Sequence, residues 1–420
     1  MSGSRSYGRG AAVLSVGIGV TGLVTYTYFS LASHSLAPDE YGRISLLWSA
    51  VFVVVSVIYR PVEQLLSRTI AERSAESHVL RVAASIQAVL ALVFLVAALA
   101  LRAPIEDGLF GGSQTLYWIF VGTVLVYAAS YFARGFLAGH HRFGSYGLLV
   151  LLEASSRCLF AIAVAVGISE GQDAVAFGML AAPIASLAVV PFALPRVRRS
   201  PDPPGDSSEL QDFTLRHGTG FAAAVLLVML SEQTFLNAGP LLVKATESGA
   251  EGAALAGFTF NVLLIARAPL QLFQSVQTSI LPHLTKMRAT GDADAFSRSI
   301  GVTLRAIAAV AGVAALVLLA IGPWAMDVLF GGDTDYGRFG LALIAVGMGL
   351  YLVAATLNQA ALARERAGQA ATCWAVSAVA FVGFLLVPGW DDRVVQVEVG
   401  YACGAALLCA LLYWLYRRPE

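Results

Sequence analysis

Apolar runs of about 20 residues recur along the whole chain, separated by short polar breaks, and no other feature constrains the fold as strongly. A run of this length crosses the hydrocarbon core of a bilayer as one α-helix. Of the 420 residues, 57% are hydrophobic and only 13% are charged, which is unlike a soluble domain of this size. The sequence therefore predicts an all-α polytopic membrane protein with about twelve transmembrane helices. The expected spans are 11–33, 44–66, 79–101, 115–138, 145–168, 172–195, 217–243, 253–281, 299–322, 337–362, 367–388 and 395–416.

The loops between these spans differ strongly in charge. If the N-terminus is cytoplasmic, seventeen lysines and arginines lie in the inner loops and tails, whereas five lie in the outer loops, which are rich in Asp and Glu. Cytoplasmic loops of membrane proteins carry such an excess of Lys and Arg. Because the number of spans is even, both termini are expected in the cytoplasm, and the protein is expected to be a multi-pass protein of the plasma (inner) membrane.

The longest polar break, residues 196–216, contains SPDPPGDSSE, a composition typical of a linker that cannot bury itself. It divides the chain into an N-terminal lobe at 1–195 and a C-terminal lobe at 217–420, each with six spans. Leu-Phe-Gly-Gly occurs once in each half, at 109–112 and at 329–332. Two further pairs of similar motifs occur, one member in each half and in the same order. This repetition suggests two six-helix lobes, an arrangement found in transporters whose substrate binds where the lobes meet.

Ionisable residues inside the apolar spans are the leading candidates for a functional site, because each costs about 3 kcal/mol at the centre of a bilayer. Arg60 and Glu63 lie beside Pro61, and Arg267 precedes Pro269 by two residues. A proline bends a membrane helix and frees backbone carbonyls. We therefore expect two bent helices, one per lobe, that each present an arginine to a shared vestibule. The guanidinium fork suits phosphate or carboxylate.

Other intramembrane candidates are carboxylates and amides. Glu153 and Arg157 are four residues apart, so they share a helix face and are expected to form either a structural ion pair or part of the cavity. Glu232 is expected either to carry a coupling proton or cation, or to pair with the arginine of the second lobe. Two amides, Asn237 and Asn261, are expected to line the same cavity.

Several function classes lack support in the sequence. The four cysteines, Cys158, Cys373, Cys403 and Cys409, lie in apolar runs and are expected to be core thiols, not disulfides or metal ligands. No phosphate-binding lysine loop and no cluster with metal-ligand spacing occurs, so neither a cofactor nor a metal is expected. Equal numbers of basic and acidic residues, 27 each, point to no nucleic-acid partner. The outer loops are too short for a catalytic domain, so we do not expect an enzyme.

Two motifs resemble a known family. The stretch 36–42, LAPDEYG, is similar to the LGPxEYG signature that follows the first helix of Wzx-like polysaccharide-biosynthesis flippases. These belong to the multidrug/oligosaccharidyl-lipid/polysaccharide (MOP, MATE-like) superfamily. The stretch 134–139, RGFLAG, with Arg142 and Phe143, resembles the pattern between helices four and five of that family. The resemblance implies a cationic central cavity that accepts a lipid-linked diphosphate, and Arg60, Arg267 and Arg157 are its expected contacts.

The function implied by this resemblance is a flippase. It would move a polyprenyl-diphosphate-linked oligosaccharide from the inner to the outer leaflet by alternating access, for cell-surface polysaccharide biosynthesis. Its expected partners are this lipid-linked substrate, membrane lipids and a coupling ion, H⁺ or Na⁺. Glu63, Glu153 and Glu232 are the expected polar or coupling groups of the cavity. The alternatives are a cation-coupled multidrug antiporter of the same fold and, third, a polytopic glycosyltransferase or ligase.

Overall fold

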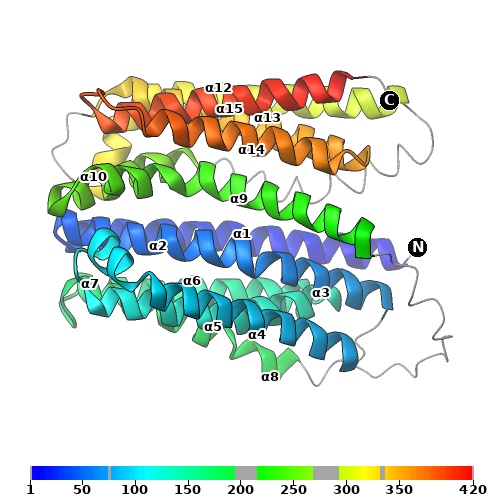
Figure 1. Cartoon of the computed structure of the whole chain (residues 1–420), viewed down its shortest axis with the longest axis horizontal. Helices are drawn as coiled ribbons and strands as arrows, with labels where there is room; N and C mark the ends of the chain where they lie inside the picture. The colour runs from blue at the N-terminus through cyan, green and yellow to red at the C-terminus, as the bar shows by residue number, and fades with distance from the viewer. Residues whose placement is uncertain (1, 74–76, 194–214, 268–292, 332–335, 419–420) are drawn as a thin grey trace.

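The computed structural model describes residues 2–73, 77–193, 215–267, 293–331 and 336–418, and within them the chain forms helices and no strands (Figure 1). The first half comprises α1 (Ser2–Ser35), α2 (Pro38–Ile58), α3 (Arg60–Arg73), α4 (Ser77–Ala100), the π-helical turn η1 (Pro104–Leu109), α5 (Gln114–Gly139), α6 (Phe143–Ala165), α7 (Gly171–Ser186) and α8 (Val189–Ala193). The second half comprises α9 (Leu215–Thr246), α10 (Gly249–Ala266), α12 (Ala293–Phe330), α13 (Arg338–Ala363), α14 (Ala367–Leu385) and α15 (Arg393–Arg417). The predicted all-α fold is confirmed.

Eleven segments of the described chain are long and apolar enough to cross a membrane. They match the second to twelfth predicted spans, and α1 covers the first, 11–33, as a continuous helix. The end of the eighth predicted span, 253–281, lies outside the described residues beyond Arg267. Large apolar side chains such as Leu92 and Val93 on α4, and Val313 and Leu316 on α12, are exposed, as expected for surfaces that face lipid. The chain is a multi-pass membrane protein.

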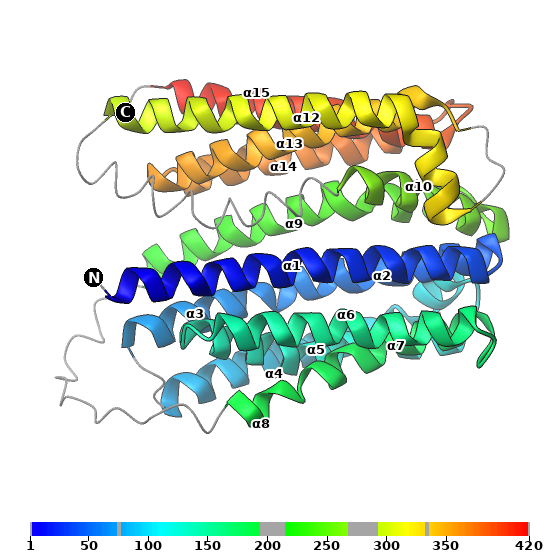
Figure 2. The ribbon, with the colours of Figure 1, turned by 180° about the vertical axis from the view of Figure 1, so that it is seen from behind.

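The helices form two bundles, and the predicted two-lobe arrangement is confirmed. In the N-lobe, α6 packs against α1 and α7, and α5 packs against α3, α4 and α7. In the C-lobe, α13 packs against α12 and α15, and α14 packs against α9 and α15. Figures 1 and 2 show both termini at the same end of the molecule, here named the terminal end; the other is the far end. The predicted linker 196–216 lies almost entirely outside the described residues, so the lobe boundaries stay a prediction.

The two lobes repeat the same local backbone, as the sequence echoes suggested. After α5, His141 has φ 55° and the Arg142 amide donates to the Leu137 carbonyl at 2.8 Å. After α13, Glu365 has φ 60° and the Arg366 amide donates at 2.9 Å to the carbonyl five residues before it. These are the same left-handed helix ends, each followed by an arginine. The first glycines of the two Leu-Phe-Gly-Gly motifs also share a left-handed backbone conformation, since Gly111 and Gly331 have φ 62° and 67°.

The predicted bend near Arg60 is a break between two helices. The hydrogen-bonded helix α2 ends at Ile58, Tyr59 caps it, and α3 starts at Arg60. Pro61 has no amide proton for the carbonyl four residues before it, which explains why the helix is interrupted here. Arg267 is the C-cap of α10, whereas Arg60 follows the C-cap of α2 by one residue, so each arginine lies at the end of a helix where the lobes meet.

The lobes meet closely where α2 packs against α9 and α10. A β-carbon on Gly42 would lie 1.9 Å from the Ala253 carbonyl oxygen, and one on Gly257 would lie 2.8 Å from the Gly42 Cα, so only glycine permits this backbone contact. Near by, Tyr41 donates a hydrogen bond to the Asn261 side chain. The far end of the lobe interface is therefore closed.

Replacing Gly42 with alanine is expected to open the far end, because the added methyl group overlaps the Ala253 backbone unless the lobes separate. Spin labels at Ala37 and Ala250, exposed residues at the starts of α2 and α10, should report a longer distance in Gly42→Ala than in the wild-type background. Gly383→Ala is the matched control, since a β-carbon there meets nothing within 4 Å. An unchanged distance in Gly42→Ala would show that the contact does not hold the lobes together.

Candidate functional site

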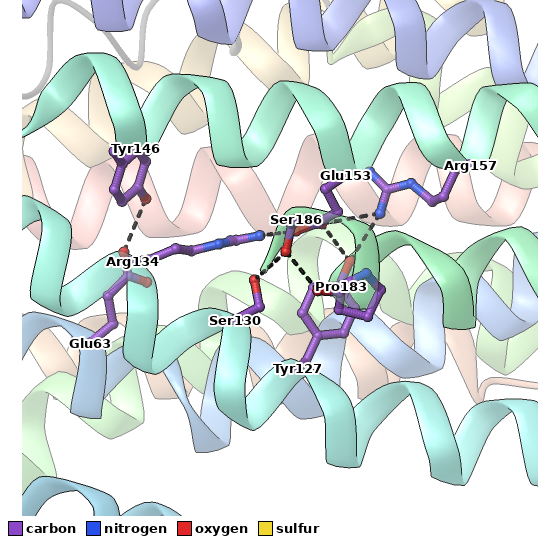
Figure 3. Close-up of polar contacts among 9 residues, drawn as sticks. All are labelled: Glu63, Tyr127, Ser130, Arg134, Tyr146, Glu153, Arg157, Pro183 and Ser186. Atoms are coloured by element: carbon purple, nitrogen blue, oxygen red, sulfur yellow. Dashed lines mark hydrogen bonds and ion pairs between the residues drawn. The ribbon is translucent and has the colours of Figure 1, made fainter. Parts of the chain in front are cut away.

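A buried charge network lies inside the N-lobe, between α5 and α6 (Figure 3). Glu153, only 2% exposed, accepts a hydrogen bond from Arg134 on one oxygen and one from the Tyr127 hydroxyl, at 2.5 Å, on the other. Arg157, one helical turn further along α6, contacts the same carboxylate at 3.2 Å and the Tyr127 hydroxyl at 2.9 Å. One carboxylate thus lies between two guanidinium groups that approach from opposite sides.

Aromatic rings enclose both arginines. The Arg157 guanidinium carbon lies 4.7 Å from the centre of the Trp48 ring, and that of Arg134 lies 4.5 Å from the centre of the Tyr131 ring. Cation–π contacts of this kind help to stabilise a guanidinium group that has lost its water. The Trp48 ring and Glu153 together stabilise the Arg157 guanidinium inside the N-lobe. The pairing of Glu153 and Arg157 is therefore a feature of the structure, and the role of Arg157 in substrate binding remains a prediction.

Further polar contacts lie beside this network. Glu63 on α3 accepts a hydrogen bond from the Tyr146 hydroxyl at 3.0 Å. Ser130 and Ser186 share a hydrogen bond of 3.2 Å, and Ser186 also donates to the Pro183 carbonyl at 2.7 Å (Figure 3). The Ser186 contact satisfies the carbonyl of Pro183 itself, the proline inside α7.

A second set of polar residues lies where the lobes meet. Arg60 interacts electrostatically with Glu232 on α9, across the interface, and with Glu63 of its own lobe. Glu232 in turn interacts with the Tyr351 hydroxyl on α13. Within the described part of the chain, the Arg60 side chain forms no ion pair at contact distance. Arg60 is thus an electrostatic neighbour of Glu232 across the interface, and the pairing of Glu232 with Arg267 stays a prediction.

Arg267 is poorly satisfied by the described residues of this interface. Its Nε and Nη2 atoms are buried and have no hydrogen-bond partner among the residues that the structure describes. Its electrostatic neighbours are three tyrosines, Tyr401, Tyr26 and Tyr351, of which Tyr26 belongs to the N-lobe and donates to the Leu264 carbonyl at 2.5 Å. Buried guanidinium groups are normally paired with an anion. Tyr351 therefore links the surroundings of Arg267 to those of Glu232 and Arg60.

The two predicted amides bind other protein groups. Asn261 accepts the hydrogen bond of Tyr41 at the lobe interface, whereas Asn237 donates to the Gln233 side chain at 3.0 Å within α9. Both are buried. Asn261 therefore lies on the contact between the lobes, and Asn237 stabilises its own helix turn.

A cavity of about 1670 Å³ opens at the far end, lined mostly by the C-lobe and also by Ser33, His34, Pro38 and Tyr41 of the N-lobe. Acidic residues dominate its charged lining: Glu247, Glu251, Asp391, Asp392 and Glu398, against His34 and Arg393. Glu398 on α15 is only 3% exposed and accepts a hydrogen bond from the Tyr336 hydroxyl. The sequence reasoning missed Glu398, although it is an acidic residue within a predicted span, the same signal that identified Glu153 and Glu232.

Comparison with solved structures shows a known transporter fold. The inward-facing conformation of a multidrug resistance MATE family transporter of the MOP superfamily aligns with a TM-score of 0.66 at 13% identity, over 97% of each chain. An outward-facing conformation under the same description gives 0.61 at 14% identity, over 97% of this chain and 94% of that one. The Vibrio cholerae MATE transporter VcmN gives 0.62 at 15% identity, over 99% and 98%. The chain has the MATE fold.

Sequence comparison finds relatives that are themselves uncharacterized. Uncharacterized protein Rv1510 of Mycobacterium tuberculosis is 27% identical over 429 residues, 94% of this chain and 89% of its own length. Uncharacterized protein Rv3630 of the same organism is 25% identical over 371 residues, 81% of this chain and 79% of its own length. No protein-family model matches the chain. The similarity to these two proteins extends over both lobes.

Proposed function

We propose that this protein is an alternating-access transporter that moves a polyprenyl-diphosphate-linked oligosaccharide from the inner to the outer leaflet of the plasma membrane. The observation that carries the proposal is the guanidinium of Arg267 at the lobe interface, whose buried Nε and Nη2 have no hydrogen-bond partner among the described residues. A cation at that depth requires an anion, and a diphosphate supplies several oxygens for a guanidinium fork. The fold supports transport, since chains of this fold have been solved in inward-facing and outward-facing forms.

Arg60 is the partner of Arg267 in this proposal. It lies at a helix end of the other lobe, and Glu232 interacts with it in the substrate-free interface. A diphosphate that enters from the inner leaflet would replace Glu232 as the counter-anion of Arg60 and would accept hydrogen bonds from Arg267. The ligand would thereby draw the two lobes together around one charge. The contact of Gly42 with the α10 backbone keeps the far end closed until the lobes rock apart.

Reconstitution of the purified protein in liposomes tests this function. A fluorescent polyprenyl-diphosphate sugar should become accessible on the opposite leaflet faster than in protein-free liposomes. A polyprenyl monophosphate without sugar is the matched lipid. It should move more slowly because it offers fewer phosphate oxygens to the two arginines. Absence of protein-dependent movement for every lipid, with or without an ion gradient, would contradict the proposal.

The cation-coupled multidrug antiporter remains the second candidate, and one observation favours it. Acidic groups outnumber basic ones in the far-end cavity, which suits a cationic ligand better than a diphosphate. The same liposomes loaded with an organic cation distinguish the two functions. Efflux driven by an inward ion gradient, in the absence of lipid movement, would favour the antiporter.

A further inference from the structure

Glu398 differs from the other buried carboxylates of the described chain. Glu153 lies between two arginines and Glu63 is close to Arg60 and Arg134, whereas no cation of the described residues forms an ion pair with Glu398. Its one hydrogen bond comes from the Tyr336 hydroxyl. Its carboxylate also packs on the bare backbone of α13, because a β-carbon on Gly340 would lie 2.3 Å from Oε1. Burying a carboxylate without a cation is costly while it is ionised, and protonation removes that cost.

The surroundings of Glu398 add negative charge and little positive charge. The titratable groups that line the cavity with it are Tyr336, His34, Glu247, Glu251, Asp391, Asp392 and Arg393. Arg393 is engaged, because its guanidinium pairs with Glu247 at 3.0 Å and donates to Gln396 at 2.9 Å. Asp392 caps α15 through the amides of Val394 and Val395. The neighbouring helix α14 carries no charged residue, and the one charge on α13, Arg338, lies outside the cavity lining.

Tyr336 connects Glu398 to two other helices. It lies two residues before α13, and its ring packs edge to face on Phe258 of α10 with centroids 5.3 Å apart. Burial and the nearby Glu398 carboxylate raise the pKa of the Tyr336 hydroxyl, so this group stays protonated and acts as the donor. A hydrogen bond to an ionised carboxylate is roughly twice as strong as one to a neutral carboxyl group. The charge on Glu398 therefore determines how firmly α10, α13 and α15 are joined at the far end.

We propose that Glu398 is a proton-coupling site of the C-lobe, which takes up a proton from the outer side through the far-end cavity and thereby loosens the contact made by Tyr336. The role in coupling rests on the proposed transport function, whereas proton binding does not. A proton suits the site better than a metal ion, because the described residues contain no group of three or more His, Cys, Asp or Glu side chains that could hold one. Helix α10, which Tyr336 contacts, ends at Ala266 and is capped by Arg267, so the two sites share one helix.

Infrared difference spectroscopy of the full-length protein in liposomes tests proton binding directly. On acidification, the wild type should show a protonated carboxyl band that Glu398→Gln lacks, and Tyr336→Phe should keep the band but change its frequency, because the hydrogen bond is lost. Glu251→Gln is the matched control, since Glu251 lines the same cavity but is exposed. A spectrum of Glu398→Gln identical to that of the wild type would overturn the proposal. A Glu398-dependent response to sodium ions with no proton band would also overturn it.

The coupling role is tested in the lipid assay with an outside-acidic gradient. The ratio of flipping rates with and without the gradient should exceed threefold in the wild type and in Glu251→Gln, and should fall to one in Glu398→Gln. An equal ratio in all three proteins would overturn the role in coupling. If the wild type moves no lipid, the transport proposal fails, while the infrared titration still decides whether Glu398 binds a proton.

Discussion

Arg267→Met is expected to reduce flipping of the lipid-linked diphosphate at least tenfold while leaving the protein as stable as the wild type, or more stable. The loss of transport follows because hydrogen bonds to charged groups contribute about 1.5–3 kcal/mol each, and a tenfold change corresponds to about 1.4 kcal/mol. Stability should not fall, since the substitution removes a cation whose buried Nε and Nη2 have no partner in the described part of the chain. Flipping rate and thermal unfolding in detergent are measured on the same preparations.

Two further variants sharpen this result. Arg267→Lys keeps the charge but not the planar fork, so it should restore part of the rate. Arg305→Met, at an exposed residue of α12, is the matched control and should leave both measurements unchanged. If Arg267→Met lowers the unfolding temperature and leaves the flipping rate intact, Arg267 has a structural role and the diphosphate proposal loses its support.

Glu153→Gln is expected to destabilise the protein by about 3–5 kcal/mol, the cost of removing one partner from a buried ion pair. The glutamine has nearly the same shape, but Arg134 and Arg157 would both lose their anion inside the N-lobe. The two substitutions are thus expected to differ in their effect on stability: removing the charge of Glu153 destabilises the protein, whereas removing the charge of Arg267 does not. Thermal unfolding followed by tryptophan fluorescence measures the difference.

A double-mutant cycle separates structure from function at this network. Arg134→Gln in the Glu153→Gln background should recover part of the lost stability, because it removes one of the uncompensated cations. Glu170→Gln, at an exposed residue before α7, is the control and should be neutral. A Glu153→Gln protein that unfolds like the wild type but no longer flips lipid would instead assign Glu153 to the transport mechanism.

Much of the fold follows from patterns that act locally. Length and hydropathy predict where helices cross the membrane, because a span must satisfy its backbone polar groups internally. Repeated motifs predicted the two lobes, and the equivalent turns at His141 and Glu365 agree with them. The helix break beside Pro61 was expected as a bend, since proline removes one amide donor whatever the neighbouring helices are.

The sequence by itself determined the fold class, the number of spans and which residues place charge in the membrane. Only the tertiary structure decided which charges are satisfied. Arg157 and Arg267 have the same side chain in the same kind of span, yet one lies between Glu153 and Trp48, whereas the described neighbours of the other are tyrosines and no anion. Hydropathy depends on each residue alone, whereas the energy of a buried charge depends on groups within a few ångströms, which packing brings from distant parts of the chain.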